Sequence, residues 1–213
     1  GDVGAGKSSF ISSLIGDTLY VDHETLQLFR DHKIMEAKSE AEKETAMKFN
    51  QEIYDKFEQC RQRNVGFSQH KVHLEGSVSL VEQTPWILNE TLRSNILFGE
   101  TLHEERYNET IELCQLARDL EILEGGDLTQ IGEKGINLSG GQKARLSIAR
   151  AVYADKDIVL MDDPLSSLDA HVKRKIFEDI CCEKLKHKTR ILVTHAVDFL
   201  DRVDRIIVMQ KGC

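Results

Sequence analysis

The sequence predicts an α/β fold in which helices flank a mostly parallel β-sheet. The chain opens with a glycine-rich loop, GDVGAGKSS, that leads directly into a helical pattern. In its last third, three short apolar runs rich in β-branched residues are separated by helical stretches. Such alternation is typical of a parallel sheet built from βαβ units. One of these runs ends in two adjacent aspartates, IVLMDD, which adds carboxylates at the end of a predicted strand.

Composition limits the classes of protein to which the chain can belong. Its 213 residues are 40% hydrophobic, which is enough for one domain with a core and for a subdomain. A formal net charge of −8 argues against a general nucleic-acid binder, because such proteins present a basic face. No apolar run approaches the ~20 residues that a membrane span needs. The five cysteines, odd in number and without a C-x-x-C spacing, indicate reduced thiols.

The predicted elements follow from local patterns along the chain. Apolar residues at helical spacing predict a first helix that ends at Gly16. Residues 25–63 contain neither glycine nor proline, and they combine an apolar stripe with a favourable Glu44–Lys48 pair, so we expect one or two exposed helices. The remaining predicted elements are a strand within 76–83, helices between about 92 and 154, and strands at Ile158–Met161, Ile191–Val193 and Ile206–Met209.

The opening residues Gly1–Ser8 fit the pattern G-x-x-x-x-G-K-[ST] and form the predicted phosphate loop. Glycines allow successive backbone N–H groups to turn inward, and the N-terminus of the following helix adds partial positive charge. Lys7 would reach the β- and γ-phosphates of a nucleotide, and Ser8 would offer its hydroxyl to Mg²⁺. The alternative is a glycine-rich turn that only caps a helix.

The two aspartates after Ile158–Met161 are the predicted metal-binding and catalytic carboxylates. Because parallel sheets bind ligands outside the carboxyl ends of their strands, Asp162 can meet the phosphate loop. Asp162 would support Mg²⁺ directly or through one of the ligands of the ion. Asp163 would face the attacking water as a general base. The alternative is a strand-ending turn, since Asp-Pro commonly initiates turns.

The pentapeptide LSGGQ, Leu138–Gln142, is called the signature below, and it precedes a helical pattern. Ser139 and Gln142 satisfy the S-x-x-Q capping box, which accounts for part of the motif. A capping box does not require two glycines, however. Gly140 and Gly141 leave backbone N–H groups bare at the positive end of a helix, where they could bind an external anion.

LSGGQ followed at short range by LMDDPLSSLDAH resembles the ATP-binding cassette, the nucleotide-binding domain of ABC transporters. The resemblance covers nearly the whole chain except about residues 17–72. The stretches QTPWILNETLRSNILFG and KTRILVTHAVDFL are similar to the first nucleotide-binding domain of the C subfamily, which contains the multidrug-resistance-associated proteins.

The resemblance implies that two cassettes stack head to tail, so that each ATP lies between one phosphate loop and the other cassette's signature. The residues that it assigns to ATP are Gly1, Asp2, Val3, Gly4, Ala5, Gly6, Lys7, Ser8, Ser9 and Gln83 for the cassette's own nucleotide, and Ser139, Gly140, Gly141 and Gln142 for the partner's. The residues that it assigns to Mg²⁺ are Ser8, Gln83 and Asp162.

Three further residues and one loop match motifs of the family. Gln83 matches the loop that contacts metal and water and couples to membrane helices, and His195 matches the switch histidine near the γ-phosphate. Asp169 matches a loop across the dimer interface, and residues 132–135 lie where exporters contact transmembrane extensions. Each has a structural alternative: a solvated glutamine for Gln83, a helix cap for Asp169, and a strand-end histidine without a ligand for His195.

Two features depart from the family pattern. Asp163 stands where most cassettes have glutamate, and its shorter side chain places the carboxylate farther from an attacking water. A displacement of about 1 Å can cost on the order of 100-fold in rate, so we expect firm ATP binding and slow hydrolysis at this site.

The second departure is at residues 17–72, which are predicted to form a charged helical insertion. The alternatives are that it docks on its own domain, docks on a partner, or remains solvated. The family's strand into the phosphate loop would precede Gly1, which predicts an N-terminally truncated fragment.

The sequence therefore predicts a P-loop ATPase core at 1–91 and 154–213 and a helical signature subdomain at 92–153. Lys7, Gln83, Asp163 and His195 would carry catalysis, with ATP and Mg²⁺ as cofactors. The chain would lie at the cytoplasmic face of a membrane and couple pairing with a second cassette to export through transmembrane domains, without a nucleic-acid partner. The alternatives are a regulatory module that gates a channel or receptor without hydrolysis, and a soluble cassette ATPase.

Overall fold

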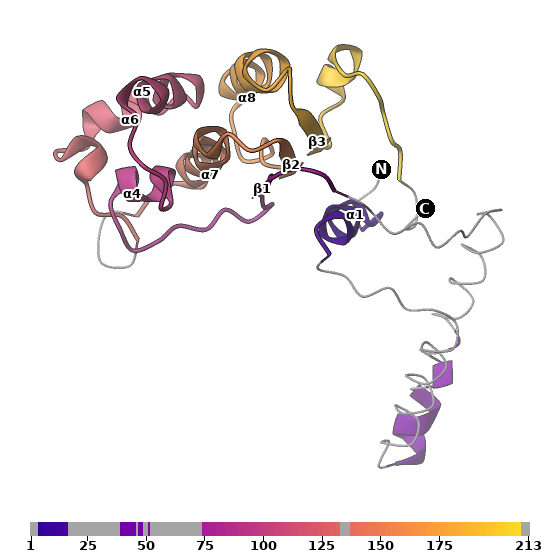
Figure 1. Cartoon of the computed structure of the whole chain (residues 1–213). Coiled ribbons are helices and arrows are strands. Elements are labelled where there is room, and N and C mark those ends of the chain that lie inside the picture. The colour runs from indigo at the N-terminus through magenta and orange to yellow at the C-terminus, as the bar shows by residue number, and fades with distance from the viewer. Residues whose placement is uncertain are drawn as a thin grey trace. The chain divides into compact units, whose positions relative to one another are not determined.

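The computed structural model divides the chain into two compact units, Gly1–Leu74 with Val208–Cys213, and Glu75–Ile207 (Figure 1). The residues that the structure describes are 4–16, 39–45, 47–48, 51, 74–132 and 137–209.

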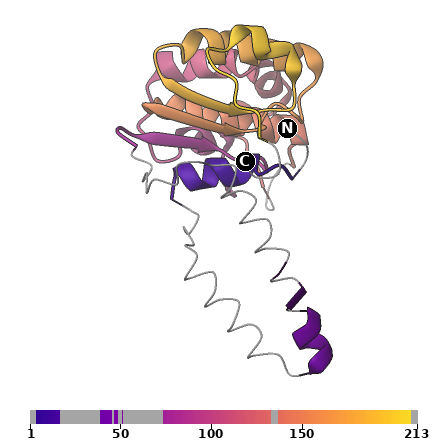
Figure 2. The same ribbon diagram turned by 90° about the vertical axis from the view of Figure 1, so that its right-hand side faces the viewer.

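A parallel sheet forms the centre of the unit Glu75–Ile207. Within the described part of this unit its strands are β1 (Val78–Val81), β2 (Ile158–Asp162) and β3 (Thr189–Val193), in the order β1-β2-β3 (Figure 2). β2 lies in the middle, and all of its residues are buried. The predicted parallel α/β fold is confirmed, and the strand bounds differ from the predicted ones by two residues at most at either end.

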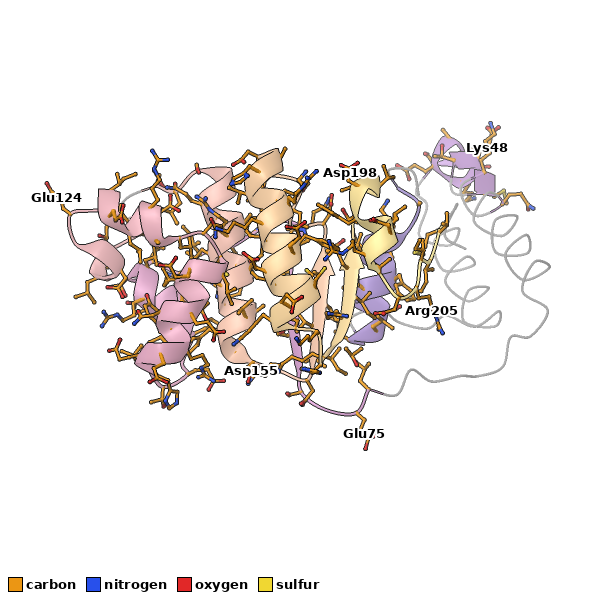
Figure 3. The ribbon with its side chains drawn as sticks, turned by 90° about the horizontal axis from the view of Figure 1, so that it is seen from above. Lys48, Glu75, Glu124, Asp155, Asp198 and Arg205 are labelled. Carbon is orange, nitrogen blue, oxygen red and sulfur yellow. The ribbon has the colours of Figure 1, made fainter. Side chains whose placement is uncertain are left out.

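Helices pack against the sheet and against one another. The predicted helices between about residues 92 and 154 are confirmed as α4 (Leu92–Leu97), α5 (Glu104–Leu113), α6 (Ala117–Ile122), the 3₁₀ turn η1 (Gly126–Leu128) and α7 (Gly140–Ala154). They are followed in the chain by α8 (Ala170–Ile176), the π-helix η2 (Phe177–Lys184) and the 3₁₀ helix η3 (Val197–Arg202). Charged side chains such as Glu124, Asp155 and Asp198 lie on the surface of this unit (Figure 3).

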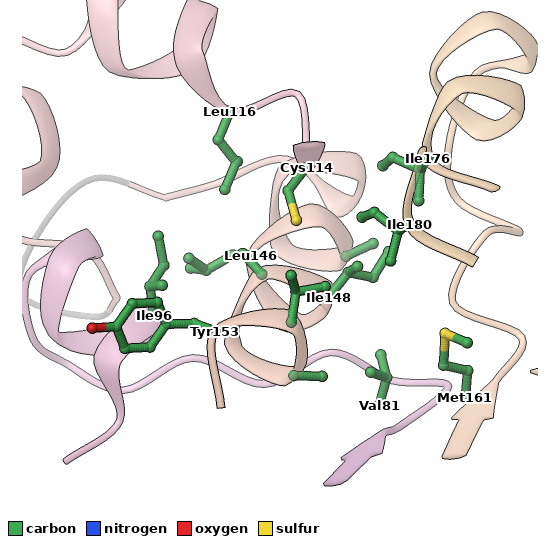
Figure 4. Close-up of a cluster of buried hydrophobic side chains, with 14 of the residues drawn as sticks. Val81, Ile96, Cys114, Leu116, Leu146, Ile148, Tyr153, Met161, Ile176 and Ile180 are labelled. Carbon is green, nitrogen blue, oxygen red and sulfur yellow. The ribbon is translucent and has the colours of Figure 1, made fainter. Parts of the chain in front are cut away.

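One hydrophobic core joins the helices to the strands. Leu146 and Ile148 of α7 belong to the same cluster as Val81 of β1, Met161 of β2 and Ile96 of α4 (Figure 4). Each large aliphatic side chain buried in this way stabilises the fold by roughly 1.5–3 kcal/mol. The predicted division into an ATPase core and a signature subdomain stays a prediction, because both ranges contribute to this cluster.

The other unit contains the helix after the phosphate loop. α1 (Lys7–Leu14) begins after Gly6, whose φ of 92° lies in the left-handed region that favours glycine. The predicted first helix is confirmed, and so is the Glu44–Lys48 ion pair, whose charged atoms lie 3.4 Å apart. Most of the predicted insertion at 17–72 lies outside the described residues.

The predicted strand Ile206–Met209 is wrong. These residues form no regular secondary structure, and Ile206, Ile207 and Val208 are exposed by 52%, 66% and 73%. A strand forms only where its backbone N–H and C=O groups pair with a neighbour. In the described part of the chain, β3 pairs with β2 alone, and no strand pairs with Ile206–Met209. Apolar, β-branched composition is therefore not sufficient to make this segment a strand.

Candidate functional site

The carboxyl ends of the three strands bring several predicted site residues to one edge of the sheet. Val81 lies opposite Met161, and Asp162 lies opposite Val193, so the strands end almost level. Gln83 and His195 each follow two residues after the end of their strand, and both side chains are exposed. The register thus groups Gln83, the two aspartates and His195, as expected for a ligand site of a parallel sheet.

Asp162 ends β2 with a carboxylate that the rest of the chain does not satisfy. The residue is only 8% exposed, and its Oδ1 atom has no hydrogen-bond partner among the described residues. A buried carboxylate oxygen without a partner is costly, and such an oxygen is the kind of ligand that Mg²⁺ prefers. Asp162 therefore has the chemistry of a magnesium ligand.

Asp163 starts a tight turn that other backbone groups hold in place. Its φ of 48° is unusual for a residue other than glycine. Its backbone N–H donates to Val193 O at 2.9 Å, and its C=O accepts from the backbone N–H and hydroxyl of Ser166 at 3.3 and 2.8 Å. The alternative prediction of a strand-ending turn is therefore confirmed as local geometry. The same geometry fixes the position from which the buried Asp163 carboxylate projects.

The signature begins α7, and its predicted capping box is confirmed. Ser139 Oγ accepts from the Gln142 N–H at 3.2 Å, while Gln142 Oε1 accepts from the Ser139 N–H at 2.8 Å. Gly140 is exposed, and a Cβ atom placed there would meet no atom within 4 Å. The first turn of α7 therefore combines a closed cap with an open glycine face that can admit an anion.

Sequence reasoning missed Asp119 and Arg150, whose side chains contact α7 or project from it. Gln142 Nε2 donates to Asp119 Oδ1 of α6 at 2.8 Å, across 23 positions of sequence. Arg150 of α7 is buried, donates to Asn95 O at 2.9 Å and lies 3.8 Å from the ring centroid of Trp86. No motif links either residue to its partner, so the sequence contains no direct signal for them.

Arg150 supports an exposed apolar surface that includes residues shortly after Gln83 in the chain. The rings of Trp86 and Phe98 meet edge to face at 5.4 Å, and Arg150 lies against both. Burial lowers the pKa of Arg150 to about 10, so the guanidinium stays charged at neutral pH. Trp86, Leu88 and Phe98 are all exposed, and we call these three residues the aromatic patch.

The described part of the phosphate loop has the backbone of an anion-binding turn. Gly4 and Gly6 both have positive φ, 78° and 92°, and Lys7 and Ser8 open α1. Gly1, Asp2 and Val3 lie outside the described residues. The loop and the strand ends belong to different units, so the meeting of Lys7 with Asp162 stays a prediction.

The remaining predictions concern a helix cap, a loop and the cysteines. Asp169 caps α8, since its side chain accepts from the Val172 N–H at 3.1 Å, as the structural alternative expected. Of the predicted loop at 132–135, only Gly132 lies within the described residues.

The three described cysteines, Cys114, Cys181 and Cys182, are free thiols. None of the described helices has the length and apolar character to span a bilayer.

Comparison with known proteins identifies the family. A model of the ABC transporter family matches residues 1–166. The chain belongs to this family. Domains of the ABC transporter family generally bind ATP with Mg²⁺ and act as ATPases, which confirms the predicted cofactors and enzyme class at the level of the family.

This ABC domain is similar to members of the C subfamily, as the resemblance implied. It is 56% identical over 144 residues to the human (Homo sapiens) ATP-binding cassette sub-family C member 3, covering 67% of the chain and 9% of that protein. It is 44% identical over 215 residues to ABC transporter C family member 8 of Dictyostelium discoideum, covering 100% of the chain and 10% of that protein. Against ABC transporter C family member 9 of Arabidopsis thaliana, identity is 52% over 141 residues, 66% of the chain and 9% of that protein. The chain thus spans about a tenth of the length of these relatives.

Proposed function

We propose that this chain is an ATP-binding and ATP-hydrolysing domain that couples the pairing of two cassettes to export through transmembrane domains. The observation that carries the proposal is the edge of the sheet where Asp162 ends β2 and where Gln83, Asp163 and His195 follow strand ends that are almost level. Buried Asp162 Oδ1, which has no partner among the described residues, supports a cation at this edge.

The phosphate loop and Asp162 would both take part in binding the same nucleotide and its metal ion. The backbone N–H groups of Gly1–Ser9 and the Lys7 ammonium would bind the triphosphate, while Ser8, Gln83 and Asp162 would face the metal. When bound, Mg²⁺ supplies neutralisation of the charge that develops on the β- and γ-phosphate oxygens.

Asp163, Gln83 and His195 would position the attacking water. The backbone of Asp163 is held by Val193 on one side and by Ser166 on the other. These hydrogen bonds oppose a backbone shift that would make up for the methylene that aspartate lacks relative to glutamate. This geometry supports slow hydrolysis at the cassette's own site.

The signature would complete the nucleotide site of a partner cassette. Gly140 faces open space, and the backbone N–H groups of the first turn of α7 lie beside it. An anion at a helix N-terminus is stabilised by these N–H groups and by the helix dipole. We infer that the γ-phosphate of the partner's ATP binds there in a head-to-tail pair.

The aromatic patch would connect the cassette to the membrane part of the transporter. Its exposed side chains Trp86 and Leu88 follow shortly after Gln83 in the chain, and the ring of exposed Phe98 packs against that of Trp86. Arg150 and Asn95 hold this segment on α7 through a hydrogen bond between Arg150 Nη2 and Asn95 Oδ1 at 3.2 Å. Transmembrane domains that contact the patch would therefore sense changes near Gln83. This arrangement would place the chain at the cytoplasmic face of a membrane.

The test compares Gly140→Asp with Gly140→Ala in the full transporter. Neither side chain meets an atom at Cβ, so both variants should fold, but only aspartate sets a negative charge against the γ-phosphate. We expect Gly140→Asp to abolish ATP turnover and transport in membrane vesicles, and Gly140→Ala to keep most of both.

Lys7→Ala checks the cassette's own site, and it should abolish labelling of this cassette by a photoreactive ATP analogue. The proposal is overturned by wild-type turnover in Gly140→Asp together with undiminished labelling in Lys7→Ala. Transport without measurable ATP turnover would instead favour the regulatory module, for which Asp163 is the supporting observation.

A further inference from the structure

Asp119 of α6 contacts two residues of the helix that carries the signature. Its Oδ1 atom accepts a hydrogen bond from Gln142 Nε2 at 2.8 Å, and its Oδ2 atom lies 2.8 Å from Arg145 Nη2. Gln142 and Arg145 are three positions apart, so they share one face of α7. A single carboxylate therefore joins α6 to the first turns of α7.

The carboxylate determines which way the Gln142 amide points. A glutamine amide can present either its oxygen or its nitrogen in a given direction, and only the nitrogen can donate. Because an ionised carboxylate accepts only, Asp119 selects the NH₂ group. The opposite side of the amide, Oε1, is then left to accept from the Ser139 N–H at 2.8 Å. Asp119 thus fixes the capping box that holds Ser139 at the start of the signature.

The charge of Asp119 is largely removed from water and is balanced by Arg145. The two side chains are only 13% and 16% exposed. α6 itself has no fully buried residue and no side-chain cap, so Asp119 is a principal attachment of this short helix to α7. A displacement of α6 would change the orientation of Gln142, and with it the open face at Gly140.

We propose that Asp119 is a positioning residue that orients the signature toward the nucleotide of a partner cassette. The inference rests on the proposed function, because it gives the signature a role only in a head-to-tail pair. Its effect is specific: Asp119 acts on the partner's nucleotide site and leaves the cassette's own phosphate loop untouched.

The experiment measures ATP at each site separately in the full transporter in membrane vesicles. A photoreactive ATP analogue labels both cassettes, which are then separated by proteolysis and counted. We expect Asp119→Ala to lower labelling of the partner cassette about tenfold, since a charge-assisted hydrogen bond and an ion pair are lost. Asp119→Asn keeps an acceptor for Gln142 without the charge, and we expect a loss of roughly threefold. Labelling of this cassette's own site should change less than twofold.

The matched control is Asp127→Ala, which breaks an ion pair of the same kind that joins η1 to α4 instead of α6 to α7. Asp127 of η1 binds Arg93 of α4, with Arg93 Nε 2.7 Å from Asp127 Oδ2 and Nη2 3.1 Å from Oδ1. We expect this variant to lower stability without lowering labelling of the partner cassette. A partner-site loss in Asp127→Ala equal to that in Asp119→Ala would overturn the inference, because it would show a general effect of stability.

Gly140→Asp separates failure of the inference from failure of the proposed function. If Gly140→Asp lowers partner-site labelling and Asp119→Ala does not, the signature has its proposed role and the inference about Asp119 is wrong. If neither variant changes that labelling, the head-to-tail role of the signature is wrong, and the inference is overturned with it.

Discussion

Two aspartates at opposite ends of the same strand have opposite surroundings. Asp157 precedes β2, and its Oδ2 atom accepts from both the backbone N–H and the hydroxyl of Ser77 at 2.7 Å. Asp162 ends β2, and its Oδ1 atom is buried without a hydrogen-bond partner among the described residues. The chain satisfies the exposed carboxylate of Asp157 and leaves an oxygen of the buried carboxylate of Asp162 unsatisfied.

The difference distinguishes a structural end of the sheet from a functional one. At the amino end, the contact between Ser77 and Asp157 joins the starts of β1 and β2. Gly76 is needed there, because its φ is 110° and a Cβ atom would lie 3.0 Å from Asp157 Cβ. At the carboxyl end, the unsatisfied oxygen of Asp162 reduces stability and is available to a ligand. We therefore expect changes at Asp162 to affect function and changes at Asp157 to affect stability.

The largest expected effect is the loss of metal-dependent ATP binding at this cassette's own site in Asp162→Asn. The amide keeps the size of the side chain but removes the negative charge that would face the metal. We expect Mg²⁺-dependent labelling of this cassette by a photoreactive ATP analogue in the full transporter to fall by about 100-fold. Asp157→Asn is the matched control at the other end of β2, and it should keep this labelling within twofold of wild type. Equal losses in the two variants would contradict the comparison.

The second expected effect is on the coupling between nucleotide binding and folding. A ligand that binds only the folded chain raises the free energy of unfolding by about 2.7 kcal/mol at 100 times its dissociation constant. We expect ATP with Mg²⁺ to stabilise the wild-type chain by this amount in urea titrations, and to stabilise Asp162→Asn much less at the same concentrations. Replacing Mg²⁺ with a chelator should remove the difference between the two proteins in how much ATP stabilises them. If it persists without the metal, Asp162 does not act through the cation.

The third expected effect is a gain in stability from the same substitution when no ligand is present. Without nucleotide or metal, Asp162→Asn should be more stable than wild type by about 1 kcal/mol, because it removes a buried carboxylate with an unsatisfied oxygen. Urea titration in the presence of a chelator measures this change. A clear loss of stability would mean that the carboxylate contributes to the fold in the same way as Asp157.

The sequence predicted the local features of this comparison better than the distant ones. The pattern IVLMDD predicted both the strand and the carboxylates at its end, and S-x-x-Q predicted the cap of α7, because these signals lie within a few residues. The pairing of Asp157 with Ser77 spans 80 positions, and that of Asp119 with Gln142 spans 23. Such contacts depend on the packing of the whole unit, which no local pattern encodes.

The wrong strand at Ile206–Met209 has the same cause. Its residues resemble those of β2 and β3 in composition, since all three runs are short and rich in isoleucine and valine. β2 and β3 become strands because each has a partner in register, and Ile206–Met209 has none among the described residues. Composition therefore gives the tendency to form a strand, whereas a neighbouring strand decides whether it forms.

The smallest expected effect is a change in the acid stability of Asp157→Asn. Hydrogen bonds from the Ser77 hydroxyl and backbone N–H lower the pKa of Asp157 below its ordinary value. A carboxyl group with a lowered folded-state pKa stabilises the fold fully above its unfolded value of about 3.9, and this contribution is lost as the pH falls through the folded value. We therefore expect Asp157→Asn to have a lower melting temperature than wild type at pH 7, and the gap to close below about pH 4. A gap of the same size at pH 3 and pH 7 would show that the charge of Asp157 does not stabilise the amino end of the sheet.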